Sequence, residues 1–234
     1  MTAHWTTGSE TDLRLILVRH ATHGDYGRRL TGRGDGASLT LDGAREARAV
    51  ARRLAEERLD EVQTSPRTRA RETAEAIGAG TGLGVVVAEA LDEIDFGAWT
   101  GAEFDALEGD PQWERWNAQR SEARTPGGES MAEAADRIEA HVRGLAETRP
   151  GERIALVTHA DMIRGLVARL LGMSLDNILR FEIGPASVSR IEAGRWGARV
   201  VSLNEPGGRM TEGRDRATAH DDEASAVQRS GGRR

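Results

Sequence analysis

The sequence predicts an α/β fold, a three-layer α/β/α sandwich with a mainly parallel central sheet. Short apolar segments rich in β-branched residues alternate with amphipathic helical segments over most of the 234 residues. The strongest apolar segments, 13–18 and 153–158, are typical of strands buried on both faces. We therefore expect one domain over residues 13–204, after a flexible N-terminus (1–12) and before a disordered tail (205–234) in which apolar residues nearly vanish.

Three strands and two helices are predicted in the first half of the chain. Thr40 is the expected N-cap of the first helix, and its apolar residues recur at helical spacing as far as Leu54. Ser65 and Pro66 are the expected N-cap and first residue of the second helix, which should stop at Gly78. The predicted strands of this half are residues 13–18, 61–64 and 85–87.

The second half continues the alternation after an irregular segment. That segment, residues 98–127, holds three of the five tryptophans and should form short helices and loops that cap the site. Ser130 and Glu133 form a capping box at the start of an amphipathic helix. The helix after strand 153–158 should end near Gly172. Three final strands are predicted, at about residues 180–184, 187–193 and 196–203.

Composition excludes several classes of protein. The net charge is −6, so no global basic field favours nucleic acid or membranes as partners. The chain contains no cysteine, which rules out disulfides, thiolate zinc sites and a cysteine nucleophile. No apolar run approaches the roughly 20 residues that span a bilayer, and the N-terminus lacks the apolar stretch of a signal peptide. We expect a cytoplasmic protein without a membrane partner.

Residues suited to phosphate chemistry follow the predicted strands. Arg19 and His20 come directly after the first strand, and His159 comes directly after strand 153–158. An arginine-rich segment, 65–69, follows the second strand, and an acidic segment, 91–97, follows the third. Because ligands of open α/β sheets bind beyond the carboxyl ends of the strands, these segments should converge on one site.

Such a set of side chains suits transfer of a phosphoryl group. Arginines near helix N-termini bind phosphate through paired hydrogen bonds and the helix dipole. A neutral imidazole is a competent nucleophile toward phosphorus when one ring nitrogen is held as a donor. A nearby carboxylic acid can protonate the leaving oxygen and later activate water.

Five blocks of this sequence, in order from about residue 13 to 204, resemble the histidine phosphatase superfamily, which includes the phosphoglycerate mutases. The resemblance implies a phosphoglycerate mutase-like fold, with His20 phosphorylated, Glu93 as proton donor, and Arg19, Arg69 and His159 holding the phosphoryl group. It also implies that Thr31, Gly32 and Ala160 bind substrate. The blocks are Arg19-His20-Ala21-Thr22, Leu30-Thr31-Gly32 with Leu39-Thr40-Leu41-Asp42-Gly43, Ser65 to Ala74, Leu91 to Gly97 with Trp99 and Gly101, and Val157-Thr158-His159-Ala160; Pro126 to Ser130 also recurs in the family.

Several positions stay open at this stage. Ala21 replaces the usual glycine of the signature, and its methyl group could crowd the backbone beside His20. Asp92 and Asp95 are rivals of Glu93, because alternation along an extended segment could present Glu93 and Asp95 together. His23 is interpreted as a solvated loop residue rather than a pocket residue. Two further groups have expected roles: Arg28, Arg29 and Arg33 as solvated loop residues, and Trp99, Trp113 and Trp116 as cap packing.

The predicted function is hydrolysis of a phosphate monoester of a small metabolite, without a metal ion or other cofactor. A phosphoglycerate mutase is the nearest alternative, disfavoured because the region between Gly101 and Pro126 is short and acidic on balance. An inactive phosphate-binding module and a metallohydrolase that uses His20 and His159 as ligands are two further alternatives. The sequence leaves the natural substrate and the oligomeric state open, a homodimer included.

Overall fold

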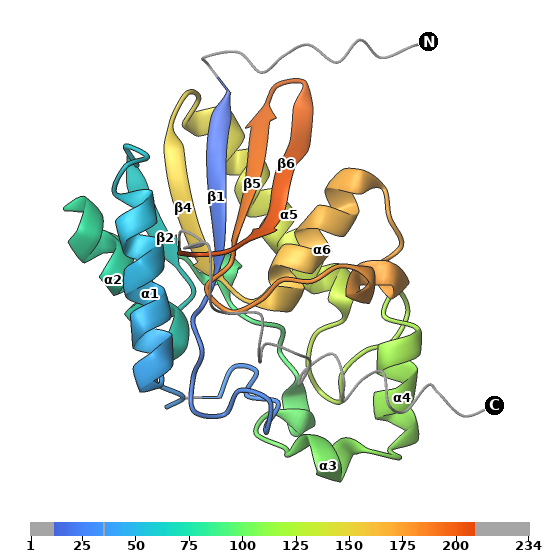
Figure 1. Ribbon diagram of the computed structural model, residues 1–234. Helices are drawn as coiled ribbons and strands as arrows, with labels where there is room; N and C mark the ends of the chain where they lie inside the picture. The colour runs from blue at the N-terminus through green and yellow to red at the C-terminus, as the bar shows by residue number, and fades with distance from the viewer. Residues whose placement is uncertain (1–11, 35, 209–234) are drawn as a thin grey trace.

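The computed structural model describes residues 12–34 and 36–208. A six-stranded sheet forms the middle layer, in the order β3-β2-β4-β1-β5-β6 (Figure 1). The four strands from β3 to β1 are parallel, and β5 runs antiparallel to β1 and to β6. This mostly parallel sheet with helices on both faces confirms the predicted fold class. The strands are β1 (Leu13–Arg19), β2 (Glu61–Thr64), β3 (Val85–Val87), β4 (Arg153–Thr158), β5 (Val188–Gly194) and β6 (Gly197–Glu205).

Helices cover the sheet on both faces, as the alternation of side chains in β1 requires. Leu13, Leu15 and Leu17 pack toward α5 and α6, whereas Ile16 and Val18 pack toward α1 and α2. Each face therefore has its own apolar cluster, and β1 is buried between them. The long helices are α1 (Leu41–Leu54), α2 (Thr68–Thr81), α5 (Met131–Thr148) and α6 (Ala160–Leu171).

Short helices form a cap beyond the carboxyl ends of the parallel strands, in the lower part of Figure 1. Trp99, Trp113 and Trp116 meet edge to face there, with ring centroids 5.3 and 6.4 Å apart, so the prediction of cap packing is confirmed. The short helices are η1 (Glu89–Leu91), η2 (Gly97–Trp99), α3 (Phe104–Leu107), α4 (Pro111–Ala118) and η3 (Leu175–Arg180).

Two helix starts follow the predicted caps and one does not. The Thr40 hydroxyl accepts a hydrogen bond from Gly43 N, and Ser130 and Glu133 form both bonds of the capping box. The predicted N-cap Ser65 is wrong: α2 begins at Thr68, after Arg67. The Ser65 hydroxyl is instead turned toward His159 and Asp92.

Two other predicted boundaries are wrong. Helix α2 passes Gly78 and continues to Thr81, because Gly82 supplies the left-handed residue (φ 75°) that ends it. The strand predicted at residues 180–184 does not form. The backbone there is bound by side chains instead: Ile183 O accepts from Arg19 Nη1 at 2.8 Å, and Gly184 N donates to Asn204 Oδ1 at 2.8 Å.

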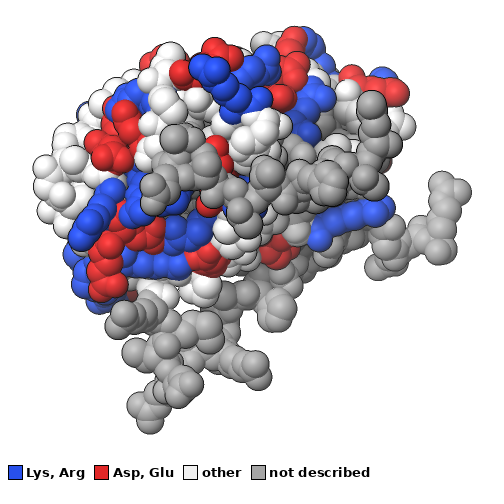
Figure 2. Space-filling model, turned by 90° about the horizontal axis from the view of Figure 1, so that it is seen from above, with Lys and Arg blue, Asp and Glu red and all other residues white. Residues whose placement is uncertain are grey.

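The opposite end of the molecule, where β1 begins, is covered by arginines and carboxylates in alternation (Figure 2). Arg199 pairs there with Glu192, which lies opposite Arg14 near the start of β1. Arg190 lies farther along the sheet, opposite Ile16, and forms ion pairs with Glu57 and Glu205. In the described part of the chain no helix combines the length and apolarity needed to cross a membrane.

Candidate active site

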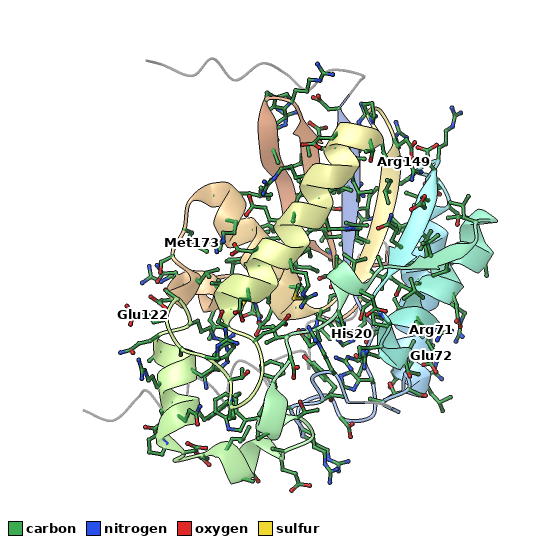
Figure 3. The ribbon with its side chains drawn as sticks, turned by 180° about the vertical axis from the view of Figure 1, so that it is seen from behind. His20, Arg71, Glu72, Glu122, Arg149 and Met173 are labelled. Carbon is green, nitrogen blue, oxygen red and sulfur yellow. The ribbon has the colours of Figure 1, made fainter. Side chains whose placement is uncertain are left out.

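The register of three neighbouring strands brings the predicted site segments together. Arg19 pairs with Thr158 across β1 and β4, so the residues that follow them, His20 and His159, lie side by side. Their ring centroids are 5.2 Å apart. Ser65 follows β2 in the same way, and its N–H donates to Val157 O at 2.9 Å. Figure 3 shows His20 beyond the end of β1, facing the cap.

His20 is held in one tautomer. Its Nδ1 lies 3.0 Å from Ala21 O, and its Nε2 accepts from Arg69 Nε at 3.3 Å. Because a guanidinium only donates, Nε2 carries the lone pair and Nδ1 carries the proton. Burial, with Arg69 and Arg19 nearby, lowers the pKa of His20 well below its usual value. The ring is therefore neutral, and the lone pair on its Nε2 faces the Arg69 guanidinium.

His159 lies at the head of a chain of buried hydrogen bonds. Its Nδ1 is 3.1 Å from Arg69 Nη2, and its Nε2 is 2.8 Å from the Ser65 hydroxyl. Ser65 donates in turn to Asp92 Oδ1 at 3.2 Å. Burial and the Arg69 charge lower the pKa of His159, so the neutral ring accepts at Nδ1 and donates from Nε2 to Ser65. The chain fixes both the plane of the ring and its proton.

Of the three candidate acids, Glu93 comes within contact distance of His159. Its Oε2 lies 3.4 Å from His159 Nδ1 and 3.8 Å from Arg69 Nη2. Asp92 turns away to pair with Arg67 Nε at 2.9 Å, and Asp95 accepts from Gly97 N. The alternative in which Glu93 and Asp95 face the site together does not hold, because Glu93 lines the pocket and Asp95 does not.

A pocket joins these groups to the cap. Its polar lining includes His20, His23, four arginines and two carboxylates, and its apolar lining includes four aromatic side chains. Arg69 links the two histidines after β1 and β4 to the loop that carries Gly32, because it also donates to Gly32 O at 2.8 Å. The residues that line the pocket are Arg19, His20, His23, Leu30, Thr31, Gly32, Arg69, Glu93, Phe96, Phe104, Trp113, Trp116, Arg120, Ala160, Asp161, Arg164 and Leu179.

Comparison with known proteins identifies the family of this chain. The family model of the histidine phosphatase superfamily (branch 1) matches residues 15–206. The chain belongs to the histidine phosphatase superfamily. It is 32% identical over 183 residues to a probable phosphoglycerate mutase, GpmB, of Cronobacter sakazakii, an alignment that covers 77% of this chain and 85% of that protein.

Several solved structures share the fold of this chain. A mycobacterial glucosyl-3-phosphoglycerate phosphatase superposes with a TM-score of 0.74 at 26% identity, over 82% of this chain and 98% of that one. Bacillus stearothermophilus YhfR superposes with a TM-score of 0.77 at 26% identity, over 82% and 97%. A phosphoserine phosphatase variant from Entamoeba histolytica, solved with phosphoserine, gives 0.74 at 25% identity, over 82% and 96%.

All eight site residues predicted for this histidine phosphatase superfamily member contribute to or border the pocket. Arg19, His20, Thr31, Gly32, Arg69, Glu93 and Ala160 line it, and His159 is packed behind them at 0% exposure. Ala21 is fully buried with an ordinary negative φ, and its methyl group packs in the cluster between β1 and α1. Alanine at this position therefore needs no left-handed backbone, and its side chain is part of the apolar core.

Two interpretations of loop residues are corrected. His23 is not solvated: it is only 4% exposed and lines the pocket. Arg33 is half-buried rather than fully solvated, since it donates to Glu93 O at 2.9 Å and pairs with Glu129 at 2.9 Å. It does not line the pocket but packs against the segment that carries Glu93. Loop residues have no periodicity, so their burial could not be read from the sequence.

Three charged residues of the pocket were not predicted from the sequence: Arg120, Asp161 and Arg164. Asp161 bridges two arginines, with Arg120 Nη1 at 2.7 Å and Arg164 Nη1 at 3.1 Å. Burial raises the pKa of Asp161, but the two arginines more than offset this and lower it to about 2. The spacing of Asp161 and Arg164 on the first turns of α6 was a signal that could have been used. Arg120 follows α4 and had no such signal.

Proposed function

We propose that this protein is a phosphatase that hydrolyses phosphate monoesters of small metabolites, with His20 as nucleophile and without a metal ion. The observation that carries the proposal is the orientation of His20, whose lone pair at Nε2 faces Arg69 inside a pocket that also contains Glu93. A neutral, fixed imidazole beside a guanidinium suits in-line attack on a bound phosphoryl group.

In the proposed first step, His20 Nε2 forms a bond to phosphorus while the bond from phosphorus to the leaving oxygen breaks. Glu93 gives its proton to that oxygen, so the product leaves as an alcohol. Arg19, Arg69 and His159 bind the phosphoryl oxygens and offset the charge that builds on them. Thr31, Gly32 and Ala160 border the same pocket and contact substrate.

In the second step, water attacks the phosphohistidine. Glu93 takes a proton from the water, the bond between His20 and phosphorus breaks, and inorganic phosphate leaves. Glu93 thus acts as acid and then as base, which its position 3.4 Å from His159 and beside Arg69 allows. Among the described residues no cluster of three or more acidic or histidine side chains is arranged to hold a metal ion.

Phosphoglycerate mutase activity is a second candidate, because relatives 32% identical to this chain are named probable phosphoglycerate mutases. A mutase returns the phosphoryl group to a bound phosphoglycerate instead of to water. An assay for interconversion of phosphoglycerates, run beside release of inorganic phosphate, separates the two activities.

The test is a screen of phosphorylated metabolites with a chelator present, in which wild type is compared with His20→Ala. We expect phosphate release by the wild type in chelator, and a loss of roughly 10⁴-fold or more in His20→Ala, as for other covalent nucleophiles. Brief mixing with labelled substrate followed by alkaline quench should leave an acid-labile phosphate on the wild type. Equal turnover by the His20→Ala variant would refute the assignment.

A further inference from the structure

The pocket contains a third imidazole with no role in the reaction described above. His23 is 4% exposed and lines the pocket. Its ring centroid lies 5.1 Å from that of His20, with the rings close to perpendicular, and His159 lies 5.2 Å from His20. The nucleophile therefore has an imidazole on each of two sides.

The contacts of His23 define which of its two ring nitrogens carries the proton. Asp25 N–H donates to His23 Nδ1 at 3.3 Å, so Nδ1 carries a lone pair. Burial, together with Arg69 and Arg19, lowers the pKa of His23 to about 3, so the ring is neutral at physiological pH. The proton of this neutral ring is therefore on Nε2.

Within the described residues, Nε2 of His23 has no hydrogen-bond acceptor. The contacts of the ring are the Asp25 N–H and the rings of His20 and Tyr26, the latter 6.3 Å away. His23 lines the pocket, so a donor there without an acceptor in the protein is available to a ligand, and a bound anion would accept from it.

We propose that His23 is a substrate-binding residue that donates from Nε2–H to a phosphoryl oxygen of the bound monoester. This inference rests on the proposed function for the identity of the substrate. The charged groups that face His23 are Arg19 and Arg69. They supply positive charge, whereas His23 adds a neutral donor with a fixed direction, which strengthens as charge builds on the phosphoryl oxygens.

Two substitutions separate this role from a structural one. The side-chain amide nitrogen of glutamine occupies the place of Nε2, so His23→Gln keeps the donor to the pocket and loses the acceptor for Asp25 N–H. The asparagine amide occupies the place of Nδ1, so His23→Asn keeps that acceptor and loses the donor. His141→Gln is the matched control, since His141 is half-buried on α5 and bonds Gln63.

If His23 binds the phosphoryl group, kcat/KM on an aryl phosphate falls by roughly 10²-fold in His23→Asn, as for loss of one oxyanion donor, and by less than about tenfold in His23→Gln. His141→Gln leaves kcat/KM unchanged. If His23 serves only to hold its loop, the order reverses: His23→Asn retains activity, and His23→Gln loses activity together with thermal stability. Equal activity of both variants and wild type also overturns the proposal.

Calorimetric titration with inorganic phosphate measures binding affinity directly, so this result does not depend on turnover. Phosphate affinity should weaken in His23→Asn and be retained in His23→Gln. If the wild type hydrolyses no monoester yet shows this pattern, the proposed function fails while the binding role of His23 stands. If the wild type hydrolyses monoesters and the pattern is absent, the binding role fails alone.

Discussion

At the scale of single residues, the series of hydrogen bonds from His159 through Ser65 to Asp92 fixes the orientation of the His159 ring. Ser65 and His159 are fully buried, and Asp92 is nearly so. The Ser65 hydroxyl lies 2.8 Å from His159 Nε2 and 3.2 Å from Asp92 Oδ1, so it connects a carboxylate to the ring. Sequence analysis assigned this serine to a helix cap, because Ser-Pro before a helical pattern is most often a cap.

Removal of the Ser65 hydroxyl should lower activity and stability together. Ser65→Ala leaves the buried Nε2–H of His159 without an acceptor, at a cost of about 1–3 kcal/mol. We expect kcat to fall by roughly tenfold or more, because His159 loses the hydrogen bond that holds the plane of its ring. Denaturant unfolding and steady-state kinetics measure the two effects. Ser189→Ala, at another fully buried serine that bonds Asn204 N, should lose stability only.

The sequence predicted that the proposed catalytic residues lie together, because each follows the carboxyl end of a predicted strand. His20 and His159 each follow a strongly apolar strand, and the parallel register then makes them neighbours. His23 could not be predicted in this way, since its burial depends on a loop that folds back and pairs at Leu39. Arg120 was likewise beyond reach, because its partner Asp161 is 41 residues away.

At the scale of elements, close backbone contacts fix the loops of the site. A Cβ atom at Gly43, near the start of α1, would lie 1.8 Å from Thr22 O, so α1 approaches the His20 loop as only glycine allows. Thr22 is also bound by Glu46 of the same helix, at 2.9 Å from its N–H. Helix α1 thus acts as a rigid support for the segment that begins with His20.

Gly43→Ala should therefore damage the site from a distance. The methyl group must push Thr22 and α1 apart, and we expect a loss of a few kcal/mol in unfolding free energy and a clear fall in kcat. Gly144→Ala is the matched control on α5, where a Cβ atom meets nothing within 4 Å. There the helix propensity of alanine should raise stability by up to about 1 kcal/mol. Similar melting temperatures for the two variants would contradict this account.

Arg137 of helix α5 holds the acidic segment, residues 91–97, in place by a set of hydrogen bonds that we call the clamp. Arg137 Nη1 donates to Ala90 O and Asp92 O at 2.9 Å each, and its Nη2 pairs with Glu129 at 2.9 Å. These bonds satisfy carbonyls of an irregular segment that no strand could pair. The position of Glu93 therefore depends on a residue of another element.

Arg137→Met should keep much of the apolar packing and lose the clamp. We expect kcat to fall by at least tenfold with a smaller change in KM, because Glu93 loses its fixed position. Arg143→Met on the same helix is the control, since Arg143 is mostly exposed and pairs only with Glu139. Unchanged kcat in Arg137→Met would show that the segment holds its shape without the clamp.

At the scale of the whole molecule, the sheet order and the two apolar faces follow from patterns that the sequence shows plainly. Strands β1 and β4 are apolar on both faces and occupy the centre, whereas β3 and β6 are short or half-exposed and occupy the edges. The end of α2 and the segment at 180–184 were predicted wrongly, because tertiary hydrogen bonds and a later glycine outweighed local propensity.

Buried neutral histidines should make the fold sensitive to mild acid. The pKa values of His20, His23 and His159 are all lowered, chiefly by burial. As pH falls below about 6.5, these residues gain protons in the unfolded chain but not in the native one, so stability present above that pH is lost. Each contributes a slope of up to about 1.4 kcal/mol per pH unit.

Urea unfolding at pH 7.5 and pH 5.5 should show a marked drop in unfolding free energy at the lower pH. His23→Gln removes one of the titrating groups, so its stability should depend less steeply on pH than that of the wild type. A free energy that is flat across this interval would mean that the histidines bind protons equally in the native and the unfolded state.

The indole cluster of the cap gives the molecule an internal optical probe. Trp99, Trp113 and Trp116 lie edge to face, and two of them border the pocket. Coupling between neighbouring indoles produces near-ultraviolet circular dichroism that is sensitive to small changes in ring geometry. Occupation of the cavity by a phosphorylated compound can therefore be followed in the unlabelled protein, through ellipticity and emission, before any bond is broken.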